Sequence, residues 1–231
     1  MRHVIQPGLA LIGGLAVSTS LFAEVSANVA LTTDYIFRGI SQSDEHPAIQ
    51  GGFDYTHDAG VFAGVWGSTV DFDDGDQASM ELDYYVGYGG EYKGLEYELS
   101  YTYYDYPGAS RAHYDYQELG AKLSYQWLSG GLTFSDDYFA ESGSYYYPWA
   151  GIDLELPQDF ALGVRAGYNS IDDNDRFGTD DYLDWSVSIT KSYLELDWGL
   201  SYVDTDLSKE DCFGGTDLCE GRLVLTVGKA L

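Results

Sequence analysis

The sequence has few cysteines, methionines, prolines and basic residues. Among 231 residues there are 2 Cys, 2 Met and 5 Pro, and 11 Lys plus Arg stand against 38 Asp plus Glu. The resulting formal net charge of −27 repels phosphate backbones and excludes nucleic-acid binding. Beyond residue 23 no apolar run reaches the roughly 18 residues that a spanning helix needs, which excludes a helical membrane protein.

Tyrosine and glycine are in excess. The chain has 22 Tyr and 28 Gly, and hydrophobic residues make up 45% of it, which a disordered acidic chain does not have. Sequences that are rich in Tyr and poor in Pro favour strands joined by turns. The predicted fold class is therefore all-β.

Residues 1–23 are predicted to be a cleaved secretory signal peptide, and residues 24–231 the folded domain. Arg2 precedes an apolar run over 9–17, and the segment ends at the small residue Ala23. A basic start, an apolar middle and a small-residue end are typical of such a leader. The alternative, an N-terminal membrane anchor, needs a longer apolar run.

Twelve segments of the chain alternate between apolar and polar residues. In the segment 194–202, for example, every second residue from Leu194 to Tyr202 is apolar. A period of two indicates strands whose two faces meet different surroundings. The twelve segments lie near 25–38, 48–57, 61–70, 80–89, 95–104, 119–127, 130–138, 145–156, 160–169, 183–190, 194–202 and 222–231.

The connections between these segments alternate between short and long. Lys93-Gly94 and Pro157–Asp159 are short, whereas Gly39–Pro47 and Asp204–Glu220 are long and acidic. Long loops at one end only, with an even number of strands, predict a transmembrane antiparallel up-and-down β-barrel with short periplasmic turns and longer extracellular loops. A soluble sandwich, the alternative, has no reason to separate its loops in this way.

The segment 33–43 has the sequence TDYIFRGISQS, and related stretches continue through 47–55 and 63–68. In these residues, and in the order and spacing of its strands, the chain resembles the TorF family of proteobacterial proteins, which are assigned as outer-membrane porins. The resemblance implies an outer-membrane β-barrel with a porin function. It brings no catalytic residues.

Function is expected on the inward face of the barrel, where acids outnumber bases. Unpaired carboxylates are costly in a dry interior, so the excess favours a hydrated lumen over one plugged by internal salt bridges. Twelve strands predict a narrow channel, since eight-stranded barrels are filled by side chains and sixteen-stranded ones are wide. The predicted lining acids are Asp34, Asp54, Glu81, Asp83, Glu96, Glu98, Glu118, Asp153, Glu155, Asp184, Glu195 and Asp197, and the predicted lining bases are Arg38, Lys122, Arg165 and Arg222.

No residue pattern indicates a catalytic centre, a metal centre or a cofactor. His113 is the one residue on which a lipid-modifying barrel enzyme, the weakest alternative, could depend. The acidic run Asp71–Asp76 departs from the twelve-position calcium loop, which favours a solvated loop. Cys212 and Cys219 are the only cysteines of an exported chain and are predicted to form a disulfide rather than a zinc site.

The sequence therefore predicts a passive channel in the outer membrane of a Gram-negative bacterium. Its solutes are expected to be small, hydrophilic and cationic, because rings of Asp and Glu attract positive charge. Outer-membrane lipid and lipopolysaccharide are its expected surroundings. The first alternative is a non-conducting barrel that acts as a structural or surface-interaction protein through its acidic loops.

Overall fold

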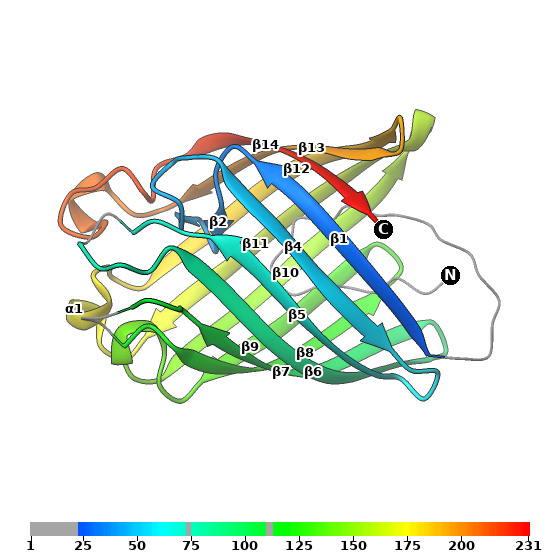
Figure 1. The fold of residues 1–231 in the computed structure, drawn as a ribbon, viewed down its shortest axis with the longest axis horizontal. Coiled ribbons are helices and arrows are strands. Elements are labelled where there is room, and N and C mark those ends of the chain that lie inside the picture. The colour runs from blue at the N-terminus through cyan, green and yellow to red at the C-terminus, as the bar shows by residue number, and fades with distance from the viewer. Residues whose placement is uncertain (1–22, 73–74, 110–112) are drawn as a thin grey trace.

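A computed structural model describes residues 23–72, 75–109 and 113–231, which form a closed antiparallel barrel of twelve strands (Figure 1). The fold class and the strand number predicted from the sequence are confirmed. The predicted signal peptide, apart from Ala23, lies outside the described residues. The barrel strands are β1 (Glu24–Thr32), β4 (Ala48–Thr56), β5 (Val61–Thr69), β6 (Met80–Tyr92), β7 (Leu95–Asp105), β8 (Tyr116–Tyr125), β9 (Leu128–Ser135), β10 (Tyr145–Leu156), β11 (Phe160–Ile171), β12 (Tyr182–Tyr193), β13 (Leu196–Thr205) and β14 (Arg222–Ala230).

Each barrel strand pairs with its neighbours along the chain, and β1 closes the barrel against β14. Within the described residues, no helix is long and apolar enough to cross a membrane. The elements outside the barrel wall are short: the strands β2 (Ile36–Phe37) and β3 (Ile40–Ser41), the helix α1 (Asn174–Phe177), and the 3-10 turns η1 (Phe139–Glu141), η2 (Pro157–Asp159) and η3 (Lys209–Asp211).

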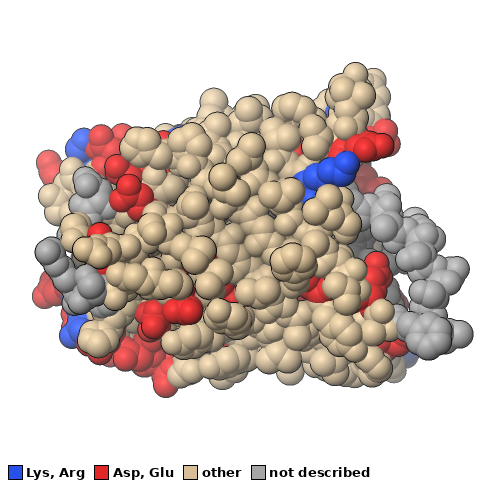
Figure 2. All heavy atoms as spheres, in the orientation of Figure 1, with Lys and Arg blue, Asp and Glu red and all other residues tan. Residues whose placement is uncertain are grey.

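The two faces of the barrel wall differ in polarity. In β7, Leu99 points outward and is 60% exposed, while its neighbours Glu98 and Ser100 point inward. Figure 2 shows a broad band with few charged side chains around the middle of the face in view, with acids gathered at the two ends. This alternation follows from the two-residue repeat of a strand and gives the outer surface the apolar band of a membrane barrel.

All long connections lie at one end of the barrel, as predicted, and this end carries α1 (Figure 1, left). We call it the long-loop end, and the half of the barrel next to the opposite end the short-turn half. The long connections cover residues 33–47, 70–79, 106–115, 136–144, 172–181 and 206–221, and the short ones 57–60, 93–94, 126–127, 157–159 and 194–195.

Several strand boundaries differ from the predicted segments, and two of these differences change where predicted lining residues lie. β1 ends at Thr32 instead of continuing to residue 38, because the chain then turns away from the wall. β13 begins at Leu196, and Leu194 and Glu195 form a two-residue turn with φ values of 54° and 59°. The prediction that Glu195 lines the lumen is therefore wrong: its side chain is 86% exposed and pairs with Lys229 at 3.2 Å.

Candidate functional site

The connection after β1 forms the hairpin β2–β3 inside the barrel. Arg38 and Gly39 occupy its two-residue turn, with φ values of 48° and 85°. Positive φ at both positions is typical of a type I′ turn, in which glycine is favoured at the second position. A side chain at Gly39 would also collide with Thr205 of β13, so the close approach of hairpin and wall requires glycine as well.

Asp34 fixes the base of this hairpin. Its carboxylate accepts hydrogen bonds from Ser41 Oγ at 2.7 Å and Ser43 Oγ at 3.0 Å, and it pairs with Arg222 Nη1 at 3.0 Å. The backbone N–H of Tyr35 donates to Ser43 Oγ at 3.0 Å. The segment TDYIFRGISQS thus supplies both the acid and the serines that close the hairpin at its base.

At the tip of the hairpin, the Arg38 side chain contacts β8 and β10 on the inner face of the wall. Its two terminal nitrogens donate to the two carboxylate oxygens of Glu118 at 2.7 and 2.8 Å. The guanidinium also lies 5.0 Å from the ring centroid of Tyr145 and 4.5 Å from that of Tyr147. From β12, Tyr182 Oη donates to the Arg38 carbonyl at 3.0 Å. Bidentate charge-assisted bonds and cation–π contacts hold the tip on three strands.

Tyr35 attaches the hairpin to the β5–β6 part of the wall. Its Oη donates to Glu81 Oε1 at 2.9 Å, and its ring meets the edge of Trp66 at a centroid distance of 5.4 Å. Burial and the negative charges of Glu81 and Asp83 raise the pKa of the Tyr35 phenol. The phenol therefore stays protonated and keeps its hydrogen bond to Glu81.

The interior is filled at the level of the hairpin. A water-filled passage would leave inward side chains exposed, yet every barrel strand has a buried inward residue there. The predicted hydrated lumen is therefore wrong for this half, because a folded-in loop supplies partners that the strand pattern does not reveal. The buried ring consists of Thr32, Ala48, Ser68, Glu81, Tyr104, Glu118, Ser135, Tyr147, Asn169, Asp184, Thr205 and Val224.

Aromatic side chains from the long connections pack over this level. Tyr114 and Phe139 stack at a centroid distance of 4.6 Å, and Tyr138 stacks on Tyr145 at 4.0 Å. Burial raises the pKa of Tyr106 and of Tyr138, so their hydroxyls remain neutral in this apolar setting. We call this cluster the aromatic lid, and its members are Phe72, Tyr106, Tyr114, Tyr138, Phe139, Phe177 and Phe213.

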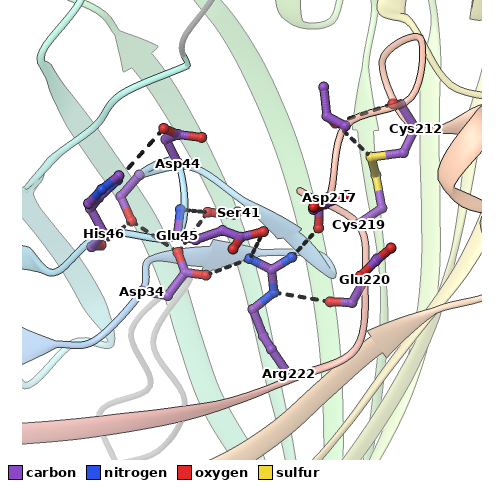
Figure 3. A network of polar contacts seen from close by, with 12 residues as sticks. Asp34, Ser41, Asp44, Glu45, His46, Cys212, Asp217, Cys219, Glu220 and Arg222 are labelled. Atoms are coloured by element: carbon purple, nitrogen blue, oxygen red, sulfur yellow. Dashed lines mark hydrogen bonds and ion pairs between the residues drawn. A yellow bond between two sulfur atoms is a disulfide. The ribbon is translucent and has the colours of Figure 1, made fainter.

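The predicted disulfide between Cys212 and Cys219 is present and buried. It closes a ring within 206–221 that lies against the hairpin base, where the Leu218 carbonyl accepts a hydrogen bond from Ser41 N at 2.9 Å. Figure 3 shows Arg222 between the two segments. Its guanidinium pairs with Asp34 and with Glu45, both at 3.0 Å, and its Nε donates to the Glu220 carbonyl at 3.0 Å.

The short-turn half has an accessible interior, which we call the cup. Most of its inward side chains are exposed or half-buried, in contrast to the ring above them, although Asp54 is buried there against Tyr85. Strands β12 and β13 contribute mainly hydroxyls, such as Ser186, Ser188 and Ser201. The accessible charged side chains of the cup include Glu96, Glu98, Lys122, Asp153, Glu155, Arg165 and Asp197.

The predicted lining residues thus divide between two levels. Seven of them are buried or nearly buried around the hairpin, seven are accessible in the cup, Asp54 is buried against Tyr85 near the short turn 57–60, and Glu195 lies in a turn. Among the seven at the hairpin, Asp184 accepts hydrogen bonds from Tyr147 Oη at 3.1 Å and Asn169 Nδ2 at 2.9 Å. These seven are Asp34, Arg38, Glu81, Asp83, Glu118, Asp184 and Arg222.

Sequence reasoning missed the aromatic residues that point inward. Tyr85, Tyr147 and Trp149 lie across Gly64, Gly167 and Gly131 of neighbouring strands, where any Cβ would collide with the ring. Glycine at these positions lets each ring lie flat on the wall. The sequence does carry a signal for these inward rings: a glycine in the polar series of one strand stands opposite an aromatic residue of the next strand.

The structure also locates the residues considered for other chemistry. His113 is exposed in the connection 106–115. Among the described residues, no group of three or more His, Cys, Asp or Glu side chains is arranged to hold a metal ion. Residues 73–74 of the acidic run Asp71–Asp76 lie outside the described part of the chain.

Known structures share this fold. The KdgM porin is 9% identical, with a TM-score of 0.55 over 90% of this chain and 98% of that one. The NanC porin is 9% identical, with a TM-score of 0.54 and coverages of 90% and 98%. The COG4313 outer membrane channel from Pseudomonas putida F1 is 10% identical, with a TM-score of 0.51 and coverages of 96% and 99%. Similarity at this level of identity shows the fold.

A protein family matches nearly the whole chain. No curated protein matches the chain significantly. Residues 16–231 match a family described as "Bacterial protein of unknown function (Gcw_chp)", whereas the resemblance to TorF stays a prediction. Because the match covers nearly the whole sequence, the chain belongs to the Gcw_chp family.

Proposed function

We propose that this protein is a porin-like channel of the bacterial outer membrane, through which small hydrophilic solutes diffuse. The cup carries this proposal. A charged, accessible inner wall lies behind an apolar outer face, and a purely structural barrel has no need of it. The likeness of the fold to outer-membrane porins supports the same function and location.

The cup favours cations. Its accessible acids outnumber Lys122 and Arg165, and the low-dielectric wall focuses their field into the lumen. Carboxylates that line a pore lower the energy of a passing positive charge relative to a negative one. Cationic solutes therefore enter the cup more readily than anionic solutes of the same size.

The hairpin β2–β3 and the aromatic lid form the barrier of this channel. Both fill the long-loop half, so a solute passes only when they are displaced. The polar fixed points of the hairpin are the Arg38–Glu118 pair, the Tyr35–Glu81 bond and the cluster at Asp34. Each of these contacts can be exchanged for a hydrogen bond with water when the hairpin leaves the interior.

Conductance in planar bilayers tests the proposal. The wild-type barrel should open rarely, and a variant in which a four-residue Gly/Ser linker replaces residues 35–42 should conduct steadily. A second variant combines this linker with Phe72→Ser and Phe139→Ser, so that a lid left in place cannot mask an open lumen. If neither variant conducts, although both still run faster on unheated gels as folded barrels do, the result would favour the non-conducting barrel. The filled long-loop half also permits that alternative.

A further inference from the structure

Two neighbouring acids on the inner wall lie at the level of the hairpin without a basic partner. Glu81 and Asp83 flank Leu82 on β6, so both point inward, and they are 1% and 4% exposed. Glu118 and Asp34 pair with arginines at 2.7 and 3.0 Å. Among the described residues, neither Glu81 nor Asp83 has a Lys or Arg partner within 4.0 Å.

The geometry of this pair requires a proton between the two carboxyl groups. A hydrogen bond joins Glu81 to Asp83. An ionised carboxylate only accepts hydrogen bonds, so one of the two groups must be protonated. Asp83 Oδ1 is buried, and no described residue donates a hydrogen bond to it. A second negative charge on the pair would therefore lack a donor and a cation, which is costly in a dry interior.

The groups that face this pair keep their charges near neutral pH. Tyr35 Oη of the hairpin donates to Glu81 at 2.9 Å. Phenols ionise at about pH 10 in water, and burial raises the pKa of Tyr35 and of Tyr106 further. The facing residues are Tyr35 on the hairpin, Trp66 and Ser68 on β5, Tyr85 on β6, Tyr104 on β7, Tyr106 in the connection 106–115, and Glu118 on β8 with its partner Arg38.

We infer that the Glu81–Asp83 pair is a pH switch that holds the hairpin β2–β3 in the barrel at acidic pH and releases it as the pH rises. With the hairpin in place, the pair keeps one proton, and its single negative charge accepts the bond from Tyr35. When the hairpin leaves, water reaches both carboxyl groups, and the shared proton passes to water. Displacement thus releases one proton, so the displaced fraction rises with pH by up to about tenfold per pH unit.

The switch rests on the proposed channel, because the hairpin is the barrier of that channel. Displacement of the hairpin can nevertheless be measured without conduction. The two proposals can therefore fail separately.

Thiol labelling of the barrel in detergent at several pH values tests the switch. Ala48 is 1% exposed and belongs to the same buried cluster as Tyr35, so a cysteine there should react only when the hairpin is displaced. At each pH the rate is divided by that of the same cysteine in the variant whose linker replaces residues 35–42. This division cancels the pH dependence of the thiol itself. Water-exposed carboxyl groups are ionised above about pH 5.5, and from there to about pH 7.5 the normalised rate should rise at least about tenfold.

Two variants remove the shared proton and keep a hydrogen bond within the pair. In Asp83→Asn, the amide N–H replaces the proton and can donate to Glu81 at every pH. Its normalised rate should not change with pH, because displacement then releases no proton. Glu81→Gln should abolish the rise in the same way, and it keeps the test available if Asp83→Asn does not fold.

Two control variants should keep the rise of the normalised rate with pH. Asp54 is also a buried inward acid bonded to a tyrosine, Tyr85, but it lies near the short turn 57–60, so Asp54→Asn is the matched control. His46→Gln removes the histidine of the connection that carries the hairpin, since a histidine titrates in the same pH range.

The outcomes separate the switch from the channel. A normalised rate that is independent of pH in the parent reporter, or that rises equally in the folded Asp83→Asn and Glu81→Gln variants, would overturn the switch. Loss of the rise in His46→Gln would assign it to the histidine and overturn the switch as well. A barrel that never conducts but shows the rise keeps the switch and refutes the channel. A barrel that conducts but shows no rise keeps the channel and refutes the switch.

Discussion

Loss of the charge on Arg38 should release the hairpin from the barrel interior. The variant Arg38→Met keeps an unbranched side chain among the rings and removes the bidentate pair with Glu118, whose side chain is 4% exposed. Removal of one partner of a buried ion pair costs about 3–5 kcal/mol, because the other charge is left uncompensated. A free-energy change of about 1.4 kcal/mol changes an equilibrium constant tenfold. The lower value of about 3 kcal/mol therefore predicts that the fraction of barrels with a displaced hairpin rises about a hundredfold.

A single reporter cysteine measures that population. Ala48 is 1% exposed and belongs to the same buried cluster as Tyr35 and Ile40 of the hairpin. In Ala48→Cys, a water-soluble thiol reagent should react only when the hairpin is displaced, and the native cysteines are already paired. The labelling rate should rise about a hundredfold when Arg38→Met is added, in line with the cost of an unpaired buried charge.

A double-mutant cycle and a matched control sharpen this test. Arg38→Met with Glu118→Gln should label more slowly than either single variant, because neither charge then remains alone. Arg176→Met removes an arginine from the exposed pair with Glu141, which is worth at most about 1 kcal/mol, and should leave labelling unchanged. If the Ala48→Cys reporter is labelled at the same rate with and without Arg38→Met, and both barrels are folded, the Arg38–Glu118 pair does not hold the hairpin in the interior.

Three further predictions use the same barrel. Replacement of both disulfide cysteines by serine removes about 2–3 kcal/mol of loop stabilisation; labelling of the reporter should increase, while the barrel keeps its shift on unheated gels. Gly39→Ala places a side chain at a φ of 85° and against the wall; a cost of at least about 1 kcal/mol should raise labelling severalfold, and an unchanged rate would contradict the tight approach. In the variant with the shortened hairpin, Glu96→Gln with Glu98→Gln should move the reversal potential toward anions, most strongly in dilute salt. Glu195→Gln, in the turn, should not move it.

The sequence alone determined the wall of the barrel and the direction in which its side chains point. A strand repeats every two residues, so the apolar series from Leu95 to Tyr103 had to share one face and Glu96 and Glu98 the other. Connection lengths fixed which ends of the strands lie together, because a hairpin turn is short and local. The spacing of the two cysteines likewise allowed their pairing to be predicted.

Only the tertiary structure decided what fills the barrel. Residues 33–38 continue the alternation of β1, and nothing local distinguishes a longer strand from a loop that turns inward. The partners that decide between them are distant in the chain: Arg38 meets Glu118 over a separation of 80 residues, and Asp34 meets Arg222 over 188. Such contacts form only after the barrel has closed and brought these strands around one lumen, so their energy leaves no periodic trace in the sequence.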